Sequence, residues 1–336
     1  MRPILALTQG DPAGIGPEIL LKLFLDCPEP AGWRPLLVAE RSALEALRPV
    51  LPGFPWHRLR YLAVAPSRDE LAGGDIPVLD PVGTRRAVAF GSSGPADAAG
   101  AMAALDAGVS LVRSGTADAL VTAPVSKGSI ARHHLPGFKG HTDYLAAACG
   151  LERYGRDYLM AFLAPDLQVA LLTVHLPLRA ALDGITRDSV GEALDCLHRH
   201  ADGRIALAGL NPHAGEGGLL GEEEDLVLAP AAAAARGRGL DVHGPASADS
   251  LFARARRGEF DWVLALYHDQ GLIAVKTAAF GCATNWTVGL PFLRTSVDHG
   301  TAFPLAGRGL ADSGPLEAVV DATLKLISGE LPKKRA

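Results

Sequence analysis

Apolar runs alternate along the chain with stretches that mix apolar and polar residues. The apolar runs are continuous and rich in Leu, Val, Ile and Ala, which is typical of strands buried on both faces of a parallel sheet. We therefore predict buried strands over residues 4–7, 34–38, 119–122, 169–174, 205–210 and 262–267.

The mixed stretches between these runs have the composition of helices. We predict helices over residues 95–114, 142–150, 187–199 and 222–238. The last two carry acidic residues near their starts and basic residues near their ends, which suits the helix dipole. Because strands and helices alternate, the pattern predicts an α/β protein with a largely parallel sheet covered by helices.

The length and charge of the chain narrow this picture. The 336 residues, 48% of them hydrophobic, exceed what one compact core usually holds, so we expect two domains. The 37 acidic and 32 basic residues are mixed along the chain, so we expect no nucleic-acid partner. The apolar start, residues 1–7, is too short for a signal peptide or a membrane span. We therefore expect a cytoplasmic protein with no membrane contact.

The four cysteines, Cys27, Cys149, Cys196 and Cys282, show no Cys-x-x-Cys spacing. We therefore expect neither a disulfide framework nor a thiolate zinc site, and we interpret them as reduced, mostly buried thiols. The basic residues 333–335 are interpreted as a solvated chain end.

Three histidines share a position that the other histidines lack. His175, His213 and His268 each follow one of the predicted apolar strands. The carboxyl ends of parallel strands line one edge of an open α/β sheet, where ligands bind, so these residues can converge. A single histidine at a strand end is usually a hydrogen-bonded loop or core residue, but three in the same context favour a metal site.

A divalent ion held by three neutral imidazoles keeps open positions for water or a substrate oxygen, as catalytic sites do. Zinc, cobalt, nickel or manganese suits nitrogen ligands, and magnesium suits a site to which the substrate adds oxygens. The pattern leaves these ions as alternatives.

Two glycine-rich segments also follow predicted strands. Residues 10–18 lead into a helix-like stretch, and Pro17 and Glu18 suit a first helical turn. The spacing differs from the Gly-x-Gly-x-x-Gly dinucleotide fingerprint, so a structural loop is as well supported as a functional one. Residues 211–221 could place backbone amides around an anion, but the acidic run 222–224 would repel it, which makes phosphate binding there a weak prediction.

Lys276, Asn285 and Arg294 recur every nine residues around an apolar stretch. Arg can bind a phosphate or a carboxylate as a fork, and Lys can bind it as a point charge. Solvated surface positions would show the same spacing, so the residues alone favour neither interpretation.

Six ordered segments resemble the motifs of the 4-hydroxythreonine-4-phosphate dehydrogenase family, and the resemblance covers nearly the whole chain. They are residues 10–18 (GDPAGIGPE), 140–142 (GHT), 173–175 (TVH), 211–216 (NPHAGE), 267–271 (YHDQG) and 289–301 (GLPFLRTSVDHGT). The resemblance implies a fold similar to that of isocitrate and isopropylmalate dehydrogenases, with two α/β/α domains around a cleft. It also implies a homodimer with the active site at the subunit interface.

The resemblance gives expected domain bounds and residue roles. We expect a first domain formed by residues 1–130 and 290–336, and a second, residues 131–289, that carries the metal-binding histidines and the dimer contacts. The metal ligands of the family match His175, His213 and His268. Its substrate-binding positions match His141, Thr142, Lys276, Asn285 and Arg294. Asp249 and Asp269 are candidates for orienting ligands or relaying protons, and no cofactor-binding residue is assigned.

The implied reaction transfers hydride from the hydroxyl-bearing carbon of 4-phosphohydroxy-L-threonine to NAD or NADP. One divalent metal (Zn, Mg, Co or Mn) polarises the hydroxyl oxygen. The resulting β-keto acid loses carbon dioxide to give 3-amino-2-oxopropyl phosphate, a step in pyridoxal or pyridoxine 5′-phosphate biosynthesis.

Other functions stay open. Relatives within the family oxidise D-threonate or D-erythronate 4-phosphate, or ring dihydrodiols. A three-histidine site could also serve a metal-dependent hydrolase without a dinucleotide. A metal-storing or scaffold protein is a further alternative, although it would leave Lys276, Asn285 and Arg294 without a role.

Overall fold

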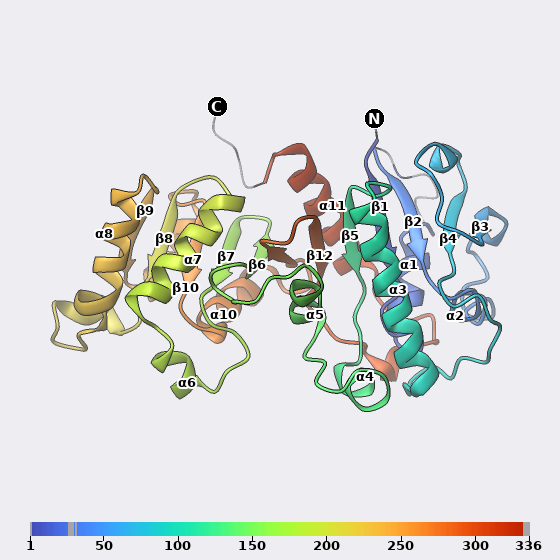
Figure 1. Ribbon diagram of the computed structural model, residues 1–336, viewed down its shortest axis with the longest axis horizontal. Coiled ribbons are helices and arrows are strands. Elements are labelled where there is room, and N and C mark those ends of the chain that lie inside the picture. Colours follow the sequence, from blue (N-terminus) through green and yellow to red (C-terminus); the bar gives the residue numbers. More distant parts are fainter. Residues whose placement is uncertain (1, 26–29, 31, 332–336) are drawn as a thin grey trace. The chain divides into compact units, whose positions relative to one another are not determined.

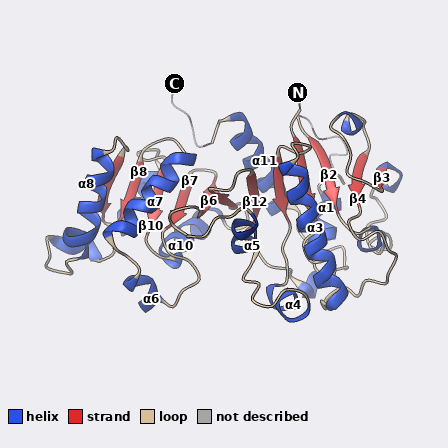
Figure 2. Ribbon diagram, viewed as in Figure 1, coloured by secondary structure: helices blue, strands red, loops and turns tan. Residues whose placement is uncertain are grey.

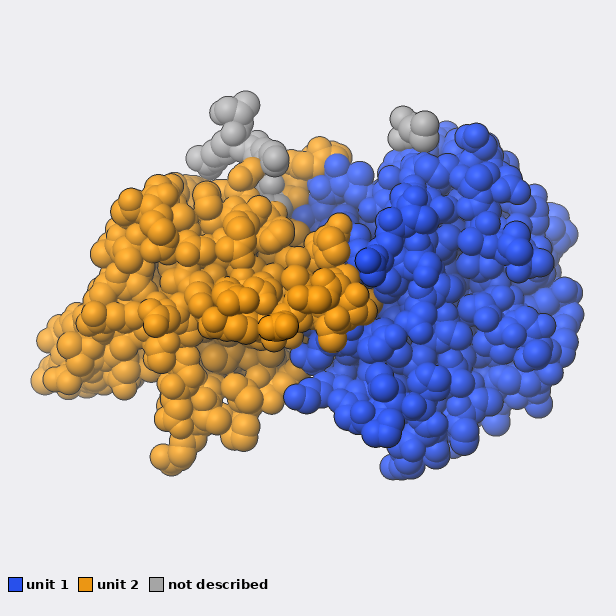
Figure 3. Space-filling model, viewed as in Figure 1, with its two compact units in different colours: residues 1–144, 292–327 blue, residues 145–291, 328–336 orange. Residues whose placement is uncertain are grey.

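The computed structural model describes residues 2–25, 30 and 32–331. The chain forms two compact units, coloured separately in Figure 3. The first contains the residues up to Tyr144 together with Phe292–Ile327, and the second contains Leu145–Pro291 and the described residues after Ile327. Contacts thus assign residues 131–144 to the first unit, whereas the sequence analysis expected them in the second domain. Cys27 and the basic residues 333–335 lie outside the described residues.

The strands of the first unit are parallel and follow the order β3-β4-β2-β1-β5-β12 (Figure 1). Their bounds are β1 Ile4–Thr8, β2 Arg34–Val38, β3 Leu59–Leu62, β4 Ile76–Leu79, β5 Ala119–Thr122 and β12 Leu293–Val297. The helices that begin in this unit are α1 Gly16–Lys22, α2 Arg41–Glu45, α3 Pro95–Arg113, α4 Lys127–His133, α5 His141–Ala148 and α11 Gly314–Ser328.

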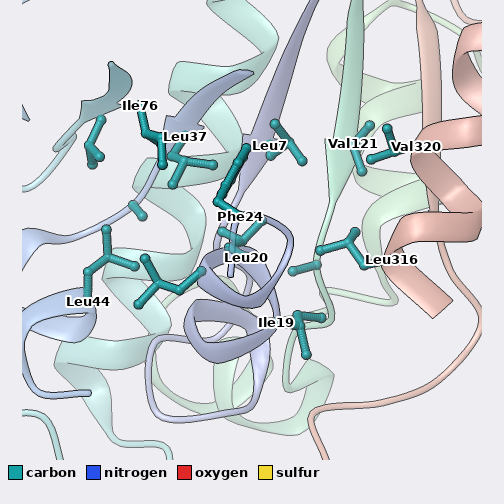
Figure 4. Close-up of a cluster of buried hydrophobic side chains, with 14 of the residues drawn as sticks. Leu7, Ile19, Leu20, Phe24, Leu37, Leu44, Ile76, Val121, Leu316 and Val320 are labelled. Carbon is teal, nitrogen blue, oxygen red and sulfur yellow. The ribbon is translucent and has the colours of Figure 1, made fainter. Parts of the chain in front are cut away.

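Strand β1 is apolar because helices cover both of its faces. On one face, Leu5 and Leu7 join a buried cluster that includes Ile19 of α1 and Leu316 of α11 (Figure 4). On the other face, α3 approaches so closely that a Cβ on Gly108 would lie 2.7 Å from Cγ2 of Thr8. Continuous apolar sequence is therefore required along this strand, as expected for a parallel sheet between two helix layers.

The strands of the second unit follow the order β11-β6-β7-β10-β8-β9. Strand β6 is antiparallel to β11 and β7, and the remaining pairs are parallel. The strand bounds are β6 Leu159–Ala164, β7 Leu167–Leu171, β8 Ile205–Ala208, β9 Val242–Ala246, β10 Trp262–Ala265 and β11 Thr284–Val288. The helices are α6 Leu178–Asp183, α7 Arg187–His200, α8 Ala229–Gly237, α9 Ala248–Arg256 and α10 His268–Ala279.

The predicted α/β class is confirmed, and Figure 2 shows strands accompanied by helices in both units. The predicted strands 34–38 and 119–122 have the observed bounds. The three strands that precede the histidines end two or three residues earlier than predicted, because the buried residues Leu172 and Leu266 already belong to loops. The predicted helix 222–238 is divided into a π-helical turn, Glu224–Leu228, and α8.

Among the described residues, no helix is both long enough and apolar enough to cross a lipid bilayer. Cys196 is buried, Cys149 is half-buried and Cys282 is exposed, and none of these three forms a disulfide bond. The expectation of mostly buried thiols was therefore wrong for Cys282, which lies in the turn between α10 and β11.

Candidate functional site

The three strands that precede the candidate metal ligands are neighbours. Strand β10 pairs in parallel with β7 on one side and with β8 on the other, so their carboxyl ends share one edge. Thr173 Oγ1 donates to Leu266 O at 2.8 Å, which ties the end of β7 to the end of β10. Gln270 Nε2 donates to Gly209 O at 2.7 Å, and Gln270 Oε1 accepts from Leu266 N at 2.7 Å. Gln270 therefore ties the ends of β10 and β8.

His175 and His268 are brought together at this edge. Their ring centroids lie 5.6 Å apart, with 40° between the ring planes. Two imidazoles that bind one ion at about 2 Å keep their centroids within roughly 6.5 Å, so this pair can share a metal. Both rings line a pocket of about 240 Å³ with Thr173, Leu178 and Tyr267.

Asp269 orients one ring of this pair. His268 Nδ1 lies 2.8 Å from Asp269 Oδ1. A carboxylate only accepts hydrogen bonds, so this contact favours the tautomer with the proton on Nδ1, which leaves Nε2 available as a ligand nitrogen. This contact matches the role that the sequence analysis considered for Asp269.

His213 does not join the pair. Within the part of the chain that the structure describes, no three His, Cys, Asp or Glu side chains are arranged to hold one metal ion. His213 is exposed in the tight turn Pro212–Glu216. A hydrogen bond from Ser247 lowers the pKa of Asp249, and the nearby His213 lowers it further. Asp249 therefore lies within electrostatic range of His213.

Two of the candidate ligands have an unusual backbone. His175 has φ of 39° and His213 has φ of 54°, both in the left-handed region that non-glycine residues rarely adopt. Such conformations cost about 1 to 3 kcal/mol each and cluster at functional sites. Ala214, Glu216 and Ala302 share this strain, so it distinguishes His175 and His213 from the other described histidines and not from every other residue.

The glycine-rich segment around His213 is occupied by its own acidic residue. Glu224 Oε1 accepts from Leu210 N and from Asn211 N, both at 2.7 Å. Burial alone would raise the pKa of Glu224, but the hydrogen bonds from Asn211 and Leu210 outweigh it and lower the pKa. Since these amides already bind a carboxylate, the structure gives no support for phosphate binding here.

The first unit contains a separate cluster of basic groups. Arg294 on β12 is 1% exposed and its Nη2 donates to Thr122 Oγ1 at 2.6 Å, at the end of β5. Burial lowers the pKa of Arg294 to about 9, so the guanidinium still carries its charge at neutral pH. A buried cation of this kind is stabilised by an anion.

His141 belongs to the same cluster. Desolvation lowers its pKa well below 6.5, and the charges of Arg294 and Lys127 lower it further. His141 is therefore neutral at pH 7 and can donate one hydrogen bond and accept another. Thr142 follows it in α5 and is buried, so its hydroxyl is held at a fixed position.

Lys127 was not identified from the sequence. The signal that identified the histidines was a polar residue soon after a buried strand. Lys127 follows the end of β5 within five residues, so the same signal applied to it. The sequence analysis applied that signal to histidines alone.

The loop of residues 10–18 has a packing role. A Cβ on Gly10 would lie 2.2 Å from Pro124 O, and a Cβ on Gly16 would lie 1.8 Å from Gln9 O. Asp11 N donates to Pro124 O at 2.9 Å. The glycines thus allow the loop after β1 to dock on the loop after β5, which favours the structural interpretation.

Lys276 and Asn285 lie in the second unit, whereas Arg294 lies in the first. Lys276 is on α10, the helix that begins at His268, and Asn285 is on β11. Asn285 Oδ1 is buried and accepts no hydrogen bond from any described residue, as a ligand-binding acceptor would. The neighbouring Trp286 packs against Trp262, with ring centroids 6.0 Å apart, and belongs to the core.

Parallel α/β units with polar and charged side chains at the carboxyl ends of their strands define the class of α/β proteins that bind small molecules there. The sequence profile of one family, described as "Pyridoxal phosphate biosynthetic protein PdxA", matches residues 32–323. The chain belongs to this family.

Relatives of similar length share much of the sequence. A 4-hydroxythreonine-4-phosphate dehydrogenase of Acidithiobacillus ferrooxidans is 42% identical over 342 residues, covering 97% of this chain and 96% of the relative. One from Chromobacterium violaceum is 44% identical over 327 residues, covering 95% of each chain.

Solved structures show the same fold. The 4-hydroxythreonine-4-phosphate dehydrogenase of Klebsiella pneumoniae superposes with a TM-score of 0.82 and 33% identity, covering 96% of this chain and 99% of that one. A terephthalate 1,2-cis-dihydrodiol dehydrogenase of Burkholderia xenovorans LB400 gives a TM-score of 0.63 and 26% identity, covering 97% and 98%.

Proposed function

We propose that the chain is a metal-requiring, NAD- or NADP-dependent dehydrogenase that oxidises 4-phosphohydroxy-L-threonine in pyridoxal phosphate biosynthesis. The observation that carries the proposal is the buried, charged Arg294 near the neutral His141, found in a chain about 40% identical to dehydrogenases named for this phosphorylated substrate. The cluster suits an anionic substrate, as a phosphorylated amino acid is.

The metal would be held by His175 and His268, whose ring spacing fits a shared ion. Within a single chain only two of the three predicted ligands, His175 and His268, lie near each other among the described residues. The residues of one chain therefore fit a metal ion only in part. The ion would act as a Lewis acid on the substrate hydroxyl. Zinc, cobalt, manganese and magnesium are the ions proposed, and Asp269 would keep His268 in the ligating tautomer.

A homodimer would complete this ligand set, and the surface of the second unit supports one. Of the thirteen exposed large apolar side chains among the described residues, eight lie in this unit: Leu176, Leu178, Leu182, Leu219, Leu220, Leu226, Ile273 and Phe280. Exposed apolar surface on a folded unit often marks an interface. We propose that a second copy covers it.

The remaining residues would bind and orient the substrate. Arg294 would pair with an oxyanion, neutral His141 and Thr142 would hydrogen-bond to it, and Lys276 and Asn285 would contact other polar groups. After hydride leaves the hydroxyl-bearing carbon for the nicotinamide, the product is a β-keto acid. Its loss of carbon dioxide yields 3-amino-2-oxopropyl phosphate.

A second substrate class is supported by one observation. The structural similarity to a dihydrodiol dehydrogenase, with a TM-score of 0.63, shows that this fold also accommodates oxidation of a ring diol. D-threonate and D-erythronate 4-phosphates are further candidates within the phosphorylated class.

A substrate panel with both dinucleotides tests the proposal. We expect absorbance of the reduced nicotinamide to appear with 4-phosphohydroxy-L-threonine, with a kcat/KM at least tenfold above that for D-erythronate 4-phosphate or a ring dihydrodiol. A higher kcat/KM for one of the latter would reassign the substrate. Product formation without nicotinamide reduction would instead support a metal-dependent hydrolase.

A further inference from the structure

We propose that Lys127 is a third basic residue of the oxyanion-binding cluster in the first unit, where its ammonium group binds the same anion as Arg294 and His141. The inference rests on the proposed function only in taking the substrate to be an anion. It adds a residue that neither the sequence motifs nor the family resemblance assigned.

The position of Lys127 is fixed by its contact with Gly140. A Cβ on Gly140 would lie 3.0 Å from Cε and 3.3 Å from Nζ of Lys127, so the end of the lysine side chain runs along the backbone just before His141. Gly140 also has φ of 147°, which disfavours any other residue. A glycine at this position therefore leaves room for the ammonium group.

The electrostatics place all three groups within interaction range. Both Arg294 and Lys127 contribute to the lowering of the pKa of His141, after desolvation. The positive charges of Arg294 and Lys127 repel each other and disfavour a further positive charge on the imidazole of His141. An oxyanion bound among the three groups would relieve this repulsion. A phosphate and a carboxylate share this chemistry.

The start of α4, where Lys127 is the first helical residue, is held by hydrogen bonds. Ser126 Oγ accepts from Ser129 N at 3.3 Å, and Ser93 Oγ donates to Ser129 Oγ at 2.7 Å. Asp11, fully buried, docks the preceding loop through its backbone bond to Pro124. A lysine on a pre-organised segment loses less conformational entropy when it binds an anion.

The test uses the full-length protein and two probes, inorganic phosphate for a phosphate group and malonate for a carboxylate. Each is titrated while the ring signal of ¹³C-labelled His141 is followed by NMR, in the wild type, Lys127→Gln, Lys127→Arg and Lys139→Gln. Lys139 is the matched control, because it is an exposed lysine beside Gly140, whereas the charges that lower the pKa of His141 are those of Arg294 and Lys127.

We expect Lys127→Gln to weaken binding of at least one probe about tenfold to a hundredfold, as expected for one charge-assisted contact. Lys127→Arg should retain most of the affinity, and Lys139→Gln should match the wild type. The pKa of His141 should rise in Lys127→Gln, because a repelling charge has been removed, which a purely structural role would not predict. A larger loss for phosphate assigns Lys127 to the phosphate group, and a larger loss for malonate assigns it to a carboxylate.

Unchanged affinity for both probes in Lys127→Gln, or no binding of either by the wild type, would overturn the inference. These titrations need no turnover. If the wild type binds phosphate through Lys127 but reduces no dinucleotide with any substrate of the panel, the proposed function fails and the inference stands.

Discussion

At the scale of single residues, the strained backbone of the candidate metal ligands matters most. Left-handed φ at His175 and His213 costs free energy that a glycine would not incur. Natural proteins retain such strain where function requires the side chain. Stability and metal binding should therefore respond in opposite directions to the same substitution.

His213→Gly is expected to be more stable than His213→Ala by roughly 1 kcal/mol, because only glycine tolerates this φ without strain. Both variants should lose metal, measured as bound metal per chain, and activity. The free energies of unfolding come from urea titrations. Ala214→Gly is the matched control: φ at Ala214 is 52°, so this change should also stabilise, while metal and activity stay at wild-type levels. Equal stability of the two His213 variants would contradict the strain argument.

His141 makes the stability of the protein depend on pH. Its pKa is lowered in the folded state, so below pH 6.5 the unfolded chain takes up a proton that the folded chain does not. The contribution of His141 to the free energy of unfolding is therefore constant above pH 6.5. Below pH 6.5 the free energy of unfolding falls by up to about 1.4 kcal/mol per pH unit because of this group. Urea titrations between about pH 7 and pH 5 should show a smaller decline for His141→Gln than for the wild type. The same decline in both would mean that His141 is not desolvated.

At the scale of elements, Gln270 connects two strand ends through its single side chain. It satisfies Leu266 N and Gly209 O, two backbone groups that would otherwise lose their partners. Removing it should disturb the loops that carry His268 and His213 together.

Gln270→Ala is expected to cost about 1 to 3 kcal/mol in the free energy of unfolding, because it leaves these two backbone groups without a partner. It should also weaken metal binding, since the ligand loops are less well ordered. Gln168→Ala is the control, as Gln168 Nε2 makes one bond of 3.3 Å, to Ala164 O. Calorimetric titration with the metal measures its affinity for the variant and the wild type. Unchanged metal affinity in Gln270→Ala would show that the two hydrogen bonds of Gln270 do not position the ligands.

Six buried strands, β1, β2, β5, β7, β8 and β10, were predicted from the sequence because continuous apolar residues leave few alternatives, whereas the short buried strand β4 was missed. Strand β12 escaped prediction, since it contains Arg294, Thr295 and Ser296, all of them buried. Their partners are remote in sequence: Arg294 bonds to Thr122, and the hydroxyls of Thr295 and Thr323 share a bond of 2.7 Å. A polar strand of this kind is stable only through contacts that one segment does not reveal.

The candidate site, like the fold, could be predicted from the sequence only in part. The strand-end rule brought His175 and His268 together correctly, because β7 and β10 are adjacent and parallel. The rule does not determine the length or direction of the following loop, so it could not indicate that the described residues form no three-residue metal group. Lys127 depends on the contact with Gly140, which no spacing along the chain encodes.

At the scale of the whole molecule, the apolar surface of the second unit predicts self-association. Ile273 is 66% exposed on α10, the helix that begins with His268. Burying such side chains in a dimer is favourable by about 25 cal/mol per Å² of apolar surface. A dimer would therefore form next to the candidate metal ligands.

Ile273→Glu is expected to weaken the dimer at least tenfold, because it places a charge in an apolar interface. Sedimentation equilibrium of the variant and the wild type measures the dissociation constant. Val64→Glu is the control, since Val64 is 75% exposed but lies in the first unit. Equal dissociation constants for Ile273→Glu and wild type, or a monomeric wild type, would exclude this surface as the interface.

The carboxylate of Glu224 has a consequence for how the protein selects among anions. Because Glu224 is covalently part of the chain and reaches the amides of Leu210 and Asn211, its effective concentration at that loop is in the millimolar range or higher. Free phosphate must compete with this built-in anion for the same two amides. Chain connectivity thus protects the amides of Leu210 and Asn211 from small anions in solution.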